Sequence, residues 1–259
     1  MSRPKCKASP SRLRHSLFIW HRYIGISVAL VVVILSLTGL LLNHTETFKL
    51  DEKKLKSNIL LDWYGLKLSP PTNSFKSGSH WVSQIEEQLY LDTRPLPHKN
   101  KSPLIGVVKT DGFIVIAFSL EIVLITNEGE LIERITPAEG LPANIYRIGL
   151  NNLEQPVIDS SSGILYSTDG LLSWENLAVN NTQWSAERAL PKQLSEEISH
   201  HFRQNIIPLE RFILDLHSGR IFGVAGVFFV DVATLLFIFL AFSGFWLWLR
   251  QRRHYKRKK

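Results

Sequence analysis

The chain is poor in sulfur, with one cysteine and one methionine among its 259 residues. Because the single cysteine, Cys6, stands in a basic N-terminal tail, the rest of the chain can form no disulfide. A domain in the middle of the chain must then be held together by an apolar core. The sequence also lacks a glycine-rich nucleotide-binding fingerprint. Its central region contains neither a nucleophile paired with a base nor a cluster of metal ligands. These absences argue against a nicotinamide- or flavin-binding enzyme and against a hydrolase.

Acidic residues are absent from both ends of the chain. Residues 1–22 and 250–259 contain 13 of the 30 Lys and Arg and none of the 23 Asp and Glu, so the remaining residues carry a net charge of −6. A nucleic-acid-binding protein presents its basic residues on a folded domain, so we expect no nucleic-acid partner. We expect the basic ends to lie against anionic lipid headgroups instead.

Two long apolar runs, residues 23–42 and 221–249, lie next to these basic ends. A helix of ~20 residues crosses a hydrocarbon core of ~30 Å, so each run is long enough to span a membrane. The first run exceeds the roughly 7–15 apolar residues of a signal peptide and is followed by no small-residue cleavage site, which indicates an uncleaved anchor.

The position of the basic residues predicts the topology. Under the positive-inside rule, the tails at residues 1–22 and 250–259 lie in the cytoplasm, and residues 43–220 lie on the other side of the membrane. For a bacterial inner membrane, that side is the periplasm. The expected fold is a membrane α-helical hairpin of two transmembrane helices, with an exported β-rich α+β domain between them.

The central region is predicted to be β-rich between residues 104 and 176, where short apolar runs alternate with turn-forming clusters. Strands are expected at residues 104–108, 113–118, 122–126 and 131–135, and again at 146–150, 156–159, 163–167 and 173–176. Before this region, residues 80–89 favour a helix, and residues 94–97 with their two prolines favour a turn. After it, residues 191–207 have the period of an amphipathic helix.

The two groups of strands resemble copies of one unit. Residues 123–131 align with residues 164–172 at a spacing of 41, within the ~40–50 residues of a propeller blade. Residues 167–174 resemble the Asp-box hairpin of bladed β-proteins, in which the aspartate, here Asp169, binds backbone amides and the tryptophan, here Trp174, packs under the turn. We expect this turn to be structural. About two such units cannot close a propeller, so a small open or sandwich-like sheet is expected.

Four of the nine histidines, His15, His21, His44 and His217, flank the apolar runs. His21 and His44 are 23 residues apart, which corresponds to ~34 Å on a continuous helix and places them at opposite faces of a membrane. A neutral imidazole is the usual protein ligand of haem iron. A pair of His44 and His217 would hold one haem b near the outer face, and His21 or His15 a second near the inner face. The alternative is that these histidines only tolerate the interface, as amphipathic side chains do.

Asp231 is the most costly residue of either apolar run, because an ionised carboxylate inside a membrane costs at least ~2.5 kcal/mol. We expect it to face protein or water. It would form a hydrogen bond to Thr38, Ser36 or a second copy of the chain, or serve in proton delivery or contact a ligand. Gly39 and Gly226 lie on small-residue faces that allow helices to approach closely. These faces indicate a homodimer or a partner membrane protein.

Four segments around the apolar runs resemble the PepSY-associated transmembrane family in order and spacing. They are His21-Arg22-Tyr23-Ile24-Gly25, Leu37-Thr38-Gly39-Leu40-Leu41-Leu42-Asn43-His44, Asp215-Leu216-His217-Ser218-Gly219-Arg220-Ile221-Phe222-Gly223 and Ser243-Gly244-Phe245-Trp246-Leu247-Trp248. Better-understood members of that family are inner-membrane reductases that use haem to release iron from siderophores in the periplasm. The resemblance implies His21, His44 and His217 as axial ligands. Larger members have four or more spans, so a haem within a four-helix bundle would require a homodimer of this chain.

Two functions follow from these observations. The first is a haem-binding membrane protein of transmembrane electron transfer, linked to the reduction of ferric siderophores or other iron. Its electron donor would be another protein or a quinol, because the short tails contain no cofactor-binding domain. The second is a non-catalytic, membrane-anchored periplasmic module that binds, scaffolds or regulates without haem.

Overall fold

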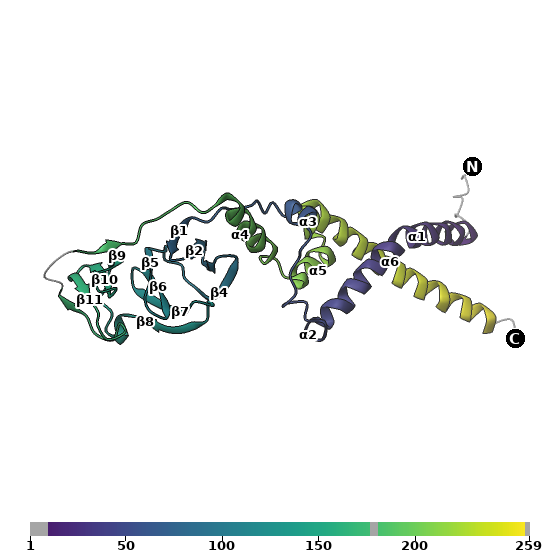
Figure 1. The fold of residues 1–259 in the computed structure, drawn as a ribbon. Coiled ribbons are helices and arrows are strands. Elements are labelled where there is room, and N and C mark those ends of the chain that lie inside the picture. Colours follow the sequence, from purple (N-terminus) through teal and green to yellow (C-terminus); the bar gives the residue numbers. More distant parts are fainter. Residues whose placement is uncertain (1–9, 177–180, 257–259) are drawn as a thin grey trace, which may run out of the picture. The chain divides into compact units, whose positions relative to one another are not determined.

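A computed structural model describes residues 10–176 and 181–256 of the chain (Figure 1). The chain forms two compact units. The helical unit combines the described parts of Met1–Leu60 and Ile206–Lys259, and the β unit is Leu61–Asn205. The two segments of the helical unit thus come from opposite ends of the sequence, as a hairpin requires.

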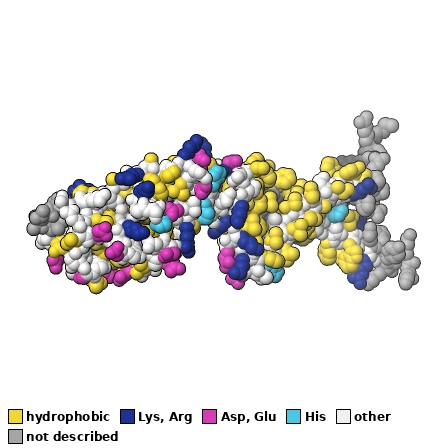
Figure 2. Space-filling model, in the orientation of Figure 1, with side chains coloured by type: hydrophobic (Ala, Val, Ile, Leu, Met, Phe, Trp, Pro, Cys, Tyr) yellow, Lys and Arg dark blue, Asp and Glu magenta, His cyan; other side chains and the backbone are white. Residues whose placement is uncertain are grey.

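Two long helices dominate the helical unit. Helices α1 (Pro10–Asn43) and α6 (Gly223–Lys256) have 34 residues each, and their apolar spans are Ile19–Asn43 and Arg220–Arg250. Large apolar side chains on them are exposed, among them Leu30, Phe228 and Phe242 at 69–72% (Figure 2). So much uncovered apolar surface on helices of this length suits contact with lipid. The predicted pair of transmembrane helices is confirmed.

Short elements connect the two spans to the rest of the chain. They are α2 (Thr45–Phe48), α3 (Asn58–Trp63), α5 (Leu209–His217) and η2 (Arg220–Phe222). Within the helical unit, residues 53–55 pair with residues 207–209, because the Leu55 amide donates to the Ile207 carbonyl at 2.9 Å and the Leu209 amide donates to the Lys53 carbonyl at 2.8 Å. Helix α5 packs against α1. This pairing brings the end of α1 and the start of α6 to one place.

The β unit consists, in its described residues, of antiparallel sheets in the orders β1-β2-β3-β4, β5-β6-β7-β8 and β12-β11-β10-β9-β13. The strands are β1 (Asn73–Ser77), β2 (His80–Ile85), β3 (Gln88–Leu91), β4 (Arg94–Lys99), β5 (Gly106–Lys109), β6 (Phe113–Phe118), β7 (Glu121–Thr126), β8 (Leu131–Ile135), β9 (Ile145–Leu150), β10 (Pro156–Ser160), β11 (Gly163–Tyr166), β12 (Glu175–Asn176) and β13 (Gln183–Trp184). A 3-10 turn, η1 (Pro137–Glu139), separates the second and third sheets. The predicted β-rich domain is confirmed.

The middle sheet is covered on both faces, and strand β6 shows why the sequence there is apolar without interruption. Ile114 and Ile116 belong to a core cluster with residues of the first sheet, whereas Val115 and Ala117 belong to a cluster with residues of the third. Successive side chains of a strand point to opposite faces, so a strand between two sheets needs apolar residues at every position.

The helix expected at residues 80–89 was wrong, because these residues form strand β2, a tight turn and the start of β3. Glu86, a good helix former, lies in the turn with a left-handed φ of 51°. Strand β2 pairs with β1 on one side and β3 on the other, and Val82 to Ile85 are all buried. Pairing and burial on a sheet thus override the local helix preference.

The turn expected at residues 94–97 was also wrong, because they belong to strand β4. Pro95 and Pro97 are two residues apart, so they occupy equivalent positions of the strand. Strand β4 is at the edge of its sheet, where an unpaired backbone position can be proline without loss of a ladder hydrogen bond.

The repeat found in the sequence corresponds to a structural repeat. Strand β7 and the turn after it occupy the same place in the second sheet as β11 and the Asp-box turn in the third. In the Asp-box turn, Asp169 accepts hydrogen bonds from the Ser173 hydroxyl and amide, the Leu172 amide and the Ser167 hydroxyl. These bonds, that from the Ser173 hydroxyl first, lower the pKa of Asp169 to about 2. Trp174 packs against the core, so this turn is structural, as expected.

The amphipathic helix expected at residues 191–207 is α4 (Lys192–Gln204). Its buried Ile198 packs with Ile85 and Tyr90 of the first sheet. Arg203 forms an ion pair with Asp62. His201 contacts the Tyr90 ring edge-on, with centroids 5.8 Å apart, and His200 is exposed. The two adjacent histidines therefore point in different directions.

Candidate functional site

His217 is the last residue of α5, and it reaches the loop-side end of α1. Its Nδ1 atom lies 2.8 Å from the Oγ1 atom of Thr38, a side chain of which only 6% is exposed. Helix α5 places the imidazole there because it packs against α1 immediately before the chain turns into α6. This contact joins two segments that are 179 residues apart in the sequence.

The hydrogen bonds of Thr38 favour one tautomer of His217. The Thr38 hydroxyl donates to the Ile34 carbonyl at 2.8 Å, with the Leu35 carbonyl at 3.1 Å. A hydroxyl has one hydrogen to donate, so when that hydrogen is on the Ile34 carbonyl, the Thr38 hydroxyl acts as an acceptor towards His217. In that arrangement the imidazole donates from Nδ1 and, when neutral, has its lone pair on Nε2.

His21 and Ser243 have the same arrangement at the other end of the helix pair. The Nδ1 atom of His21, on α1, lies 2.9 Å from Oγ of Ser243, on α6. The Ser243 hydroxyl donates to the Leu240 carbonyl at 3.1 Å. By the same reasoning, His21 donates from Nδ1 and keeps its lone pair on Nε2. Across the described residues, no protein group is hydrogen-bonded to Nε2 of either histidine.

A glycine follows the hydroxyl residue in both places. A Cβ atom at Gly39 would lie 3.4 Å from Cε1 of His217, and one at Gly244 would lie 3.4 Å from Cε1 of His21. A longer side chain at either glycine would occupy the space beside the imidazole. The two sites therefore share one pattern, in which a hydroxyl and a glycine on one helix receive a histidine from another part of the chain.

The two histidine sites lie far apart along the helix pair. Thr38 comes 17 residues after His21 on the continuous helix α1, a separation of about 26 Å at 1.5 Å per residue. This is close to the ~30 Å thickness of a hydrocarbon core. Each site is thus near one end of the span.

His44 differs from the other two histidines. It is exposed between α1 and α2, and its ring lies edge-on to Phe48, with centroids 6.2 Å apart. Gly39, which marks the level of His217, is five residues earlier, about 7.5 Å along a helix. No hydrogen bond or ring contact joins His44 to His217 within the described ranges. The side chain of His15 lies outside the described residues.

Asp231 is exposed on α6. The Thr38 hydroxyl, one of its expected partners, is instead engaged with His217 and the Ile34 carbonyl. One turn further on, Thr234 is also exposed and donates to the Val230 carbonyl at 2.9 Å. Asp231 and Thr234 thus form a polar patch on the outer surface of the helix pair.

An apolar cavity of about 410 Å³ lies beside the His217 site. Leu35 and Leu216, neighbours of Thr38 and His217 in the helices, line it together with Val31, Ile34, Gly219, Phe222, Ala225, Gly226, Phe229 and Val230. Its size is that of a small-molecule site. It offers apolar walls and no charged side chain.

His217 and His21 could each hold a metal ion or a metal-containing cofactor through Nε2. A ligating imidazole is usually neutral and donates its second ring N–H to a fixed acceptor, which orients the ring. Thr38 and Ser243 provide such acceptors for His217 and His21. The described residues contain no group of three or more His, Cys, Asp or Glu that could hold a metal ion by themselves, so a zinc-type site is not supported there.

The sequence indicates the three histidines as candidate ligands but not their contacts with Thr38 and Ser243. Each of them precedes a glycine within an apolar span, and this recurrence was the signal available in the sequence. The pairing across the fold could not be deduced, because the partners are 179 and 222 residues apart.

Comparison with known proteins agrees with the resemblance seen around the spans. The family model of the PepSY-associated TM region matches residues 112–259, which include His217, Asp231 and Ser243. No curated protein and no solved structure matches the chain. Because the match covers more than half of the chain and includes the second membrane span, this membrane protein belongs to the PepSY-associated TM region family.

Proposed function

We propose that this protein binds haem b in the bacterial inner membrane and takes part in transmembrane electron transfer linked to the reduction of ferric siderophores or other iron. In this proposal both termini are cytoplasmic and the β unit is periplasmic. The observation that carries it is the hydrogen bonding of His217 and His21, whose Nδ1 atoms face hydroxyl acceptors. This bonding makes each Nε2 available as an iron ligand.

His217 and His21 would each supply one axial ligand, and haem would supply one-electron chemistry between ferric and ferrous iron. The separation of about 26 Å between the two levels supports one haem near each membrane face, so that an electron could pass from one leaflet to the other. The apolar cavity beside His217 suits the mainly apolar face of such a group.

The second axial ligand of each haem requires a further group. His44 is the candidate near His217, either within the chain after a movement of α2 or from a second copy. A homodimer would bring two copies of each site into one four-helix arrangement. The electron donor would be another membrane protein or a quinol.

The test is an absorption spectrum of the full-length protein, produced with ample haem and purified in detergent. We expect a Soret band that shifts on reduction with dithionite. His217→Ala should remove or alter the signal of one haem, and His21→Ala should remove or alter that of the other. His44→Ala decides whether His44 is the second ligand of the haem at His217. His200→Ala is the matched control, because His200 is an exposed histidine of the β unit. A folded, haem-saturated preparation without Soret absorption would refute the proposal.

The alternative function is that of a membrane-anchored binding module without haem. It is favoured by one observation, a polar cavity whose lining residues all belong to the β unit. A protein that lacks haem but binds a ligand through the β unit would support this alternative.

A further inference from the structure

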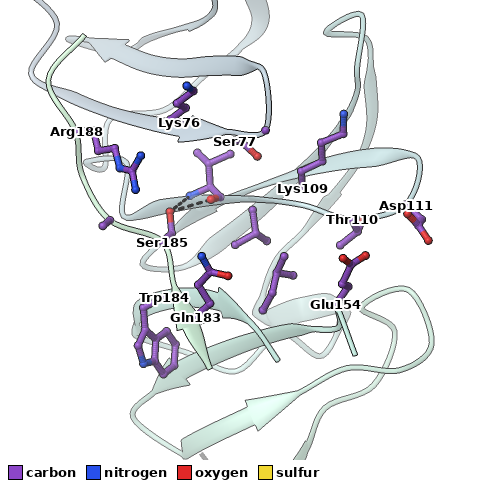
Figure 3. Close-up of a pocket in the computed structure, with 15 residues that line it drawn as sticks. Lys76, Ser77, Lys109, Thr110, Asp111, Glu154, Gln183, Trp184, Ser185 and Arg188 are labelled. Carbon is purple, nitrogen blue, oxygen red and sulfur yellow. Dashed lines mark hydrogen bonds between the residues drawn. The ribbon is translucent and has the colours of Figure 1, made fainter. Parts of the chain in front are cut away.

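A cavity of about 580 Å³ opens in the β unit where three segments meet. One wall is the end of the β1–β2 hairpin with Lys76 and Ser77, a second is β5 with Lys109, and the third is β13 and the residues that follow it, up to Arg188 (Figure 3). A cavity of this size accommodates a small organic molecule.

Three cationic side chains line this cavity, and none of them has a carboxylate partner among the described residues. Lys76 has its ammonium 5.9 Å from the centre of the Trp81 ring, and neither Lys109 nor Arg188 forms an ion pair there. Cations on a protein surface commonly have acidic neighbours. The β unit has more acidic than basic residues, but most of its acidic side chains lie elsewhere, and none of those described forms an ion pair with these three cations (Figure 2). Three unpaired cations around one hollow favour an anionic ligand.

The fold holds these cations in place. The Arg188 amide donates to the Ser74 carbonyl at 2.9 Å and the Ser74 hydroxyl donates to the Arg188 carbonyl, so Arg188 is bound to β1 two residues from Lys76. The stem of Lys109 lies against the β1–β2 turn, because a Cβ at Gly78 would be 3.2 Å from its Cδ. Arg188 and Lys109 therefore project from backbone segments that the fold already holds in place, so these segments need no ordering on binding.

Ser77 provides an independent observation. Only 4% of this residue is exposed, and its hydroxyl has no hydrogen-bond partner in the described structure. An unpaired buried hydroxyl costs free energy, unless a ligand or water completes it. By contrast, the neighbouring Ser185 hydroxyl is satisfied, since it donates to the Val107 carbonyl at 2.8 Å and accepts from the Val107 amide at 2.9 Å (Figure 3).

The acidic residues of the cavity lie at one end of it. Asp111 and Glu154 are near Thr110, whereas Lys76 and Arg188 are on the far side of Lys109 in the close-up (Figure 3). The end of the cavity that holds Lys76 and Arg188 therefore carries positive charge. It suits a compact anion, whose oxygen atoms an Arg guanidinium can bind in pairs.

We propose that this cavity binds a small polycarboxylate through Lys76, Lys109 and Arg188, with the Ser77 hydroxyl as a further donor. The proposal goes beyond haem binding, because all of its residues belong to the β unit and the histidine sites belong to the helical unit. It holds whether or not the helical unit contains haem.

The experiment measures binding of citrate to the full-length protein in detergent by calorimetry at physiological salt. Acetate serves as the single-carboxylate probe and pyrophosphate as the phosphate probe. We expect saturable citrate binding that is tighter than that of the other two. The double substitution Lys76→Gln with Arg188→Gln should weaken it about tenfold or more, because each lost bond to a charged group contributes strongly.

Two controls separate a built site from diffuse charge. Lys99→Gln with Lys101→Gln removes two cations from the same unit but outside the cavity, and it should leave citrate binding unchanged. Ser77→Ala should weaken citrate binding severalfold without lowering the thermal stability, since the hydroxyl has no protein partner. Absence of saturable citrate binding, equal losses in both double variants, or tighter binding of pyrophosphate than of citrate would each overturn the polycarboxylate assignment.

Discussion

The Nδ1 atom of His217 lies 2.8 Å from the Thr38 hydroxyl oxygen, and that hydroxyl donates its own hydrogen to the Ile34 carbonyl. His21 and Ser243 repeat this relationship at the other end of the helix pair. The same local pattern thus occurs twice, with α1 providing the hydroxyl at one site and the histidine at the other. It orients two imidazoles near the two ends of the spans.

Substitution of Thr38 tests the role of this acceptor. We expect Thr38→Val to weaken haem binding about 10–100-fold, because the imidazole loses the group that orients it and selects its tautomer. Thr38→Ser retains the hydroxyl and should bind haem as the unchanged protein does. The measurement is a haem titration followed at the Soret band. Ser27→Ala is the control, since the Ser27 hydroxyl bonds only a carbonyl of its own helix; a loss of the same size there would contradict the assigned role.

Gly226 tests packing within the chain. A Cβ atom at this position would lie 2.1 Å from the Gly219 carbonyl oxygen, so Gly226→Leu should disrupt the corner between α5 and α6 and sharply lower the thermal stability. Gly25→Leu is a matched substitution in α1, because a Cβ there meets nothing within 4 Å. Equal stability of the two variants would show that the contact between Gly219 and Gly226 is unimportant. Gly226 and Gly39 were expected at a dimer face. The space beside Gly226 is instead filled by Gly219, and the space beside Gly39 by His217, within one chain.

Asp231 tests assembly in the membrane. Because a carboxylate exposed to lipid is costly, we expect this face of α6 to be covered by a second copy of the chain. Asp231→Leu should then weaken the dimer by about 1 kcal/mol, roughly fivefold in the dissociation constant, as for other interhelical hydrogen bonds. The measurement is the monomer–dimer equilibrium in detergent, with Val232→Leu on the neighbouring position as control. A monomer for the unchanged protein at all concentrations would refute the expectation.

Asp169 predicts a pH dependence of stability. Its hydrogen bonds lower its pKa from 3.8 to about 2, so its ionised form stabilises the folded state above about pH 4, and this contribution is lost as the pH falls towards 2. Asp169→Asn should therefore reduce the thermal stability at neutral pH, and the difference from the unchanged protein should shrink between pH 4 and 2. Glu128→Gln, at the equivalent turn after β7, is the control and should have little effect. A difference that grows on acidification would contradict this account.

The topology is tested with reporter fusions. A reporter enzyme that works only in the periplasm should be inactive when fused after Lys259 and active when inserted near Asn100, because the basic residues hold both ends in the cytoplasm. A cytoplasmic reporter at the same places should give the opposite results. Activity of the periplasmic reporter after Lys259 would refute the predicted orientation.

Local patterns in the sequence were sufficient for much of the fold. Continuous apolar runs identify membrane helices, because most residues of a span must suit lipid. The strands of the second and third sheets were predicted because the apolar runs there end in glycine-containing turns. The first sheet was missed. Its residues include Glu86 in a turn and two prolines in an edge strand, and both features contradict the usual local preferences until the neighbouring strands are known.

The sequence by itself therefore determined the two membrane spans, the β-rich domain between them and the three candidate histidines, since each depends on residue type and short spacing. Only the tertiary structure decided which hydroxyl each histidine meets, that His44 stands apart from His217, and that three cations surround one cavity of the β unit. Those relationships join segments up to 222 residues apart, and hydrogen bonding and packing between distant segments leave no periodic signal along a single chain.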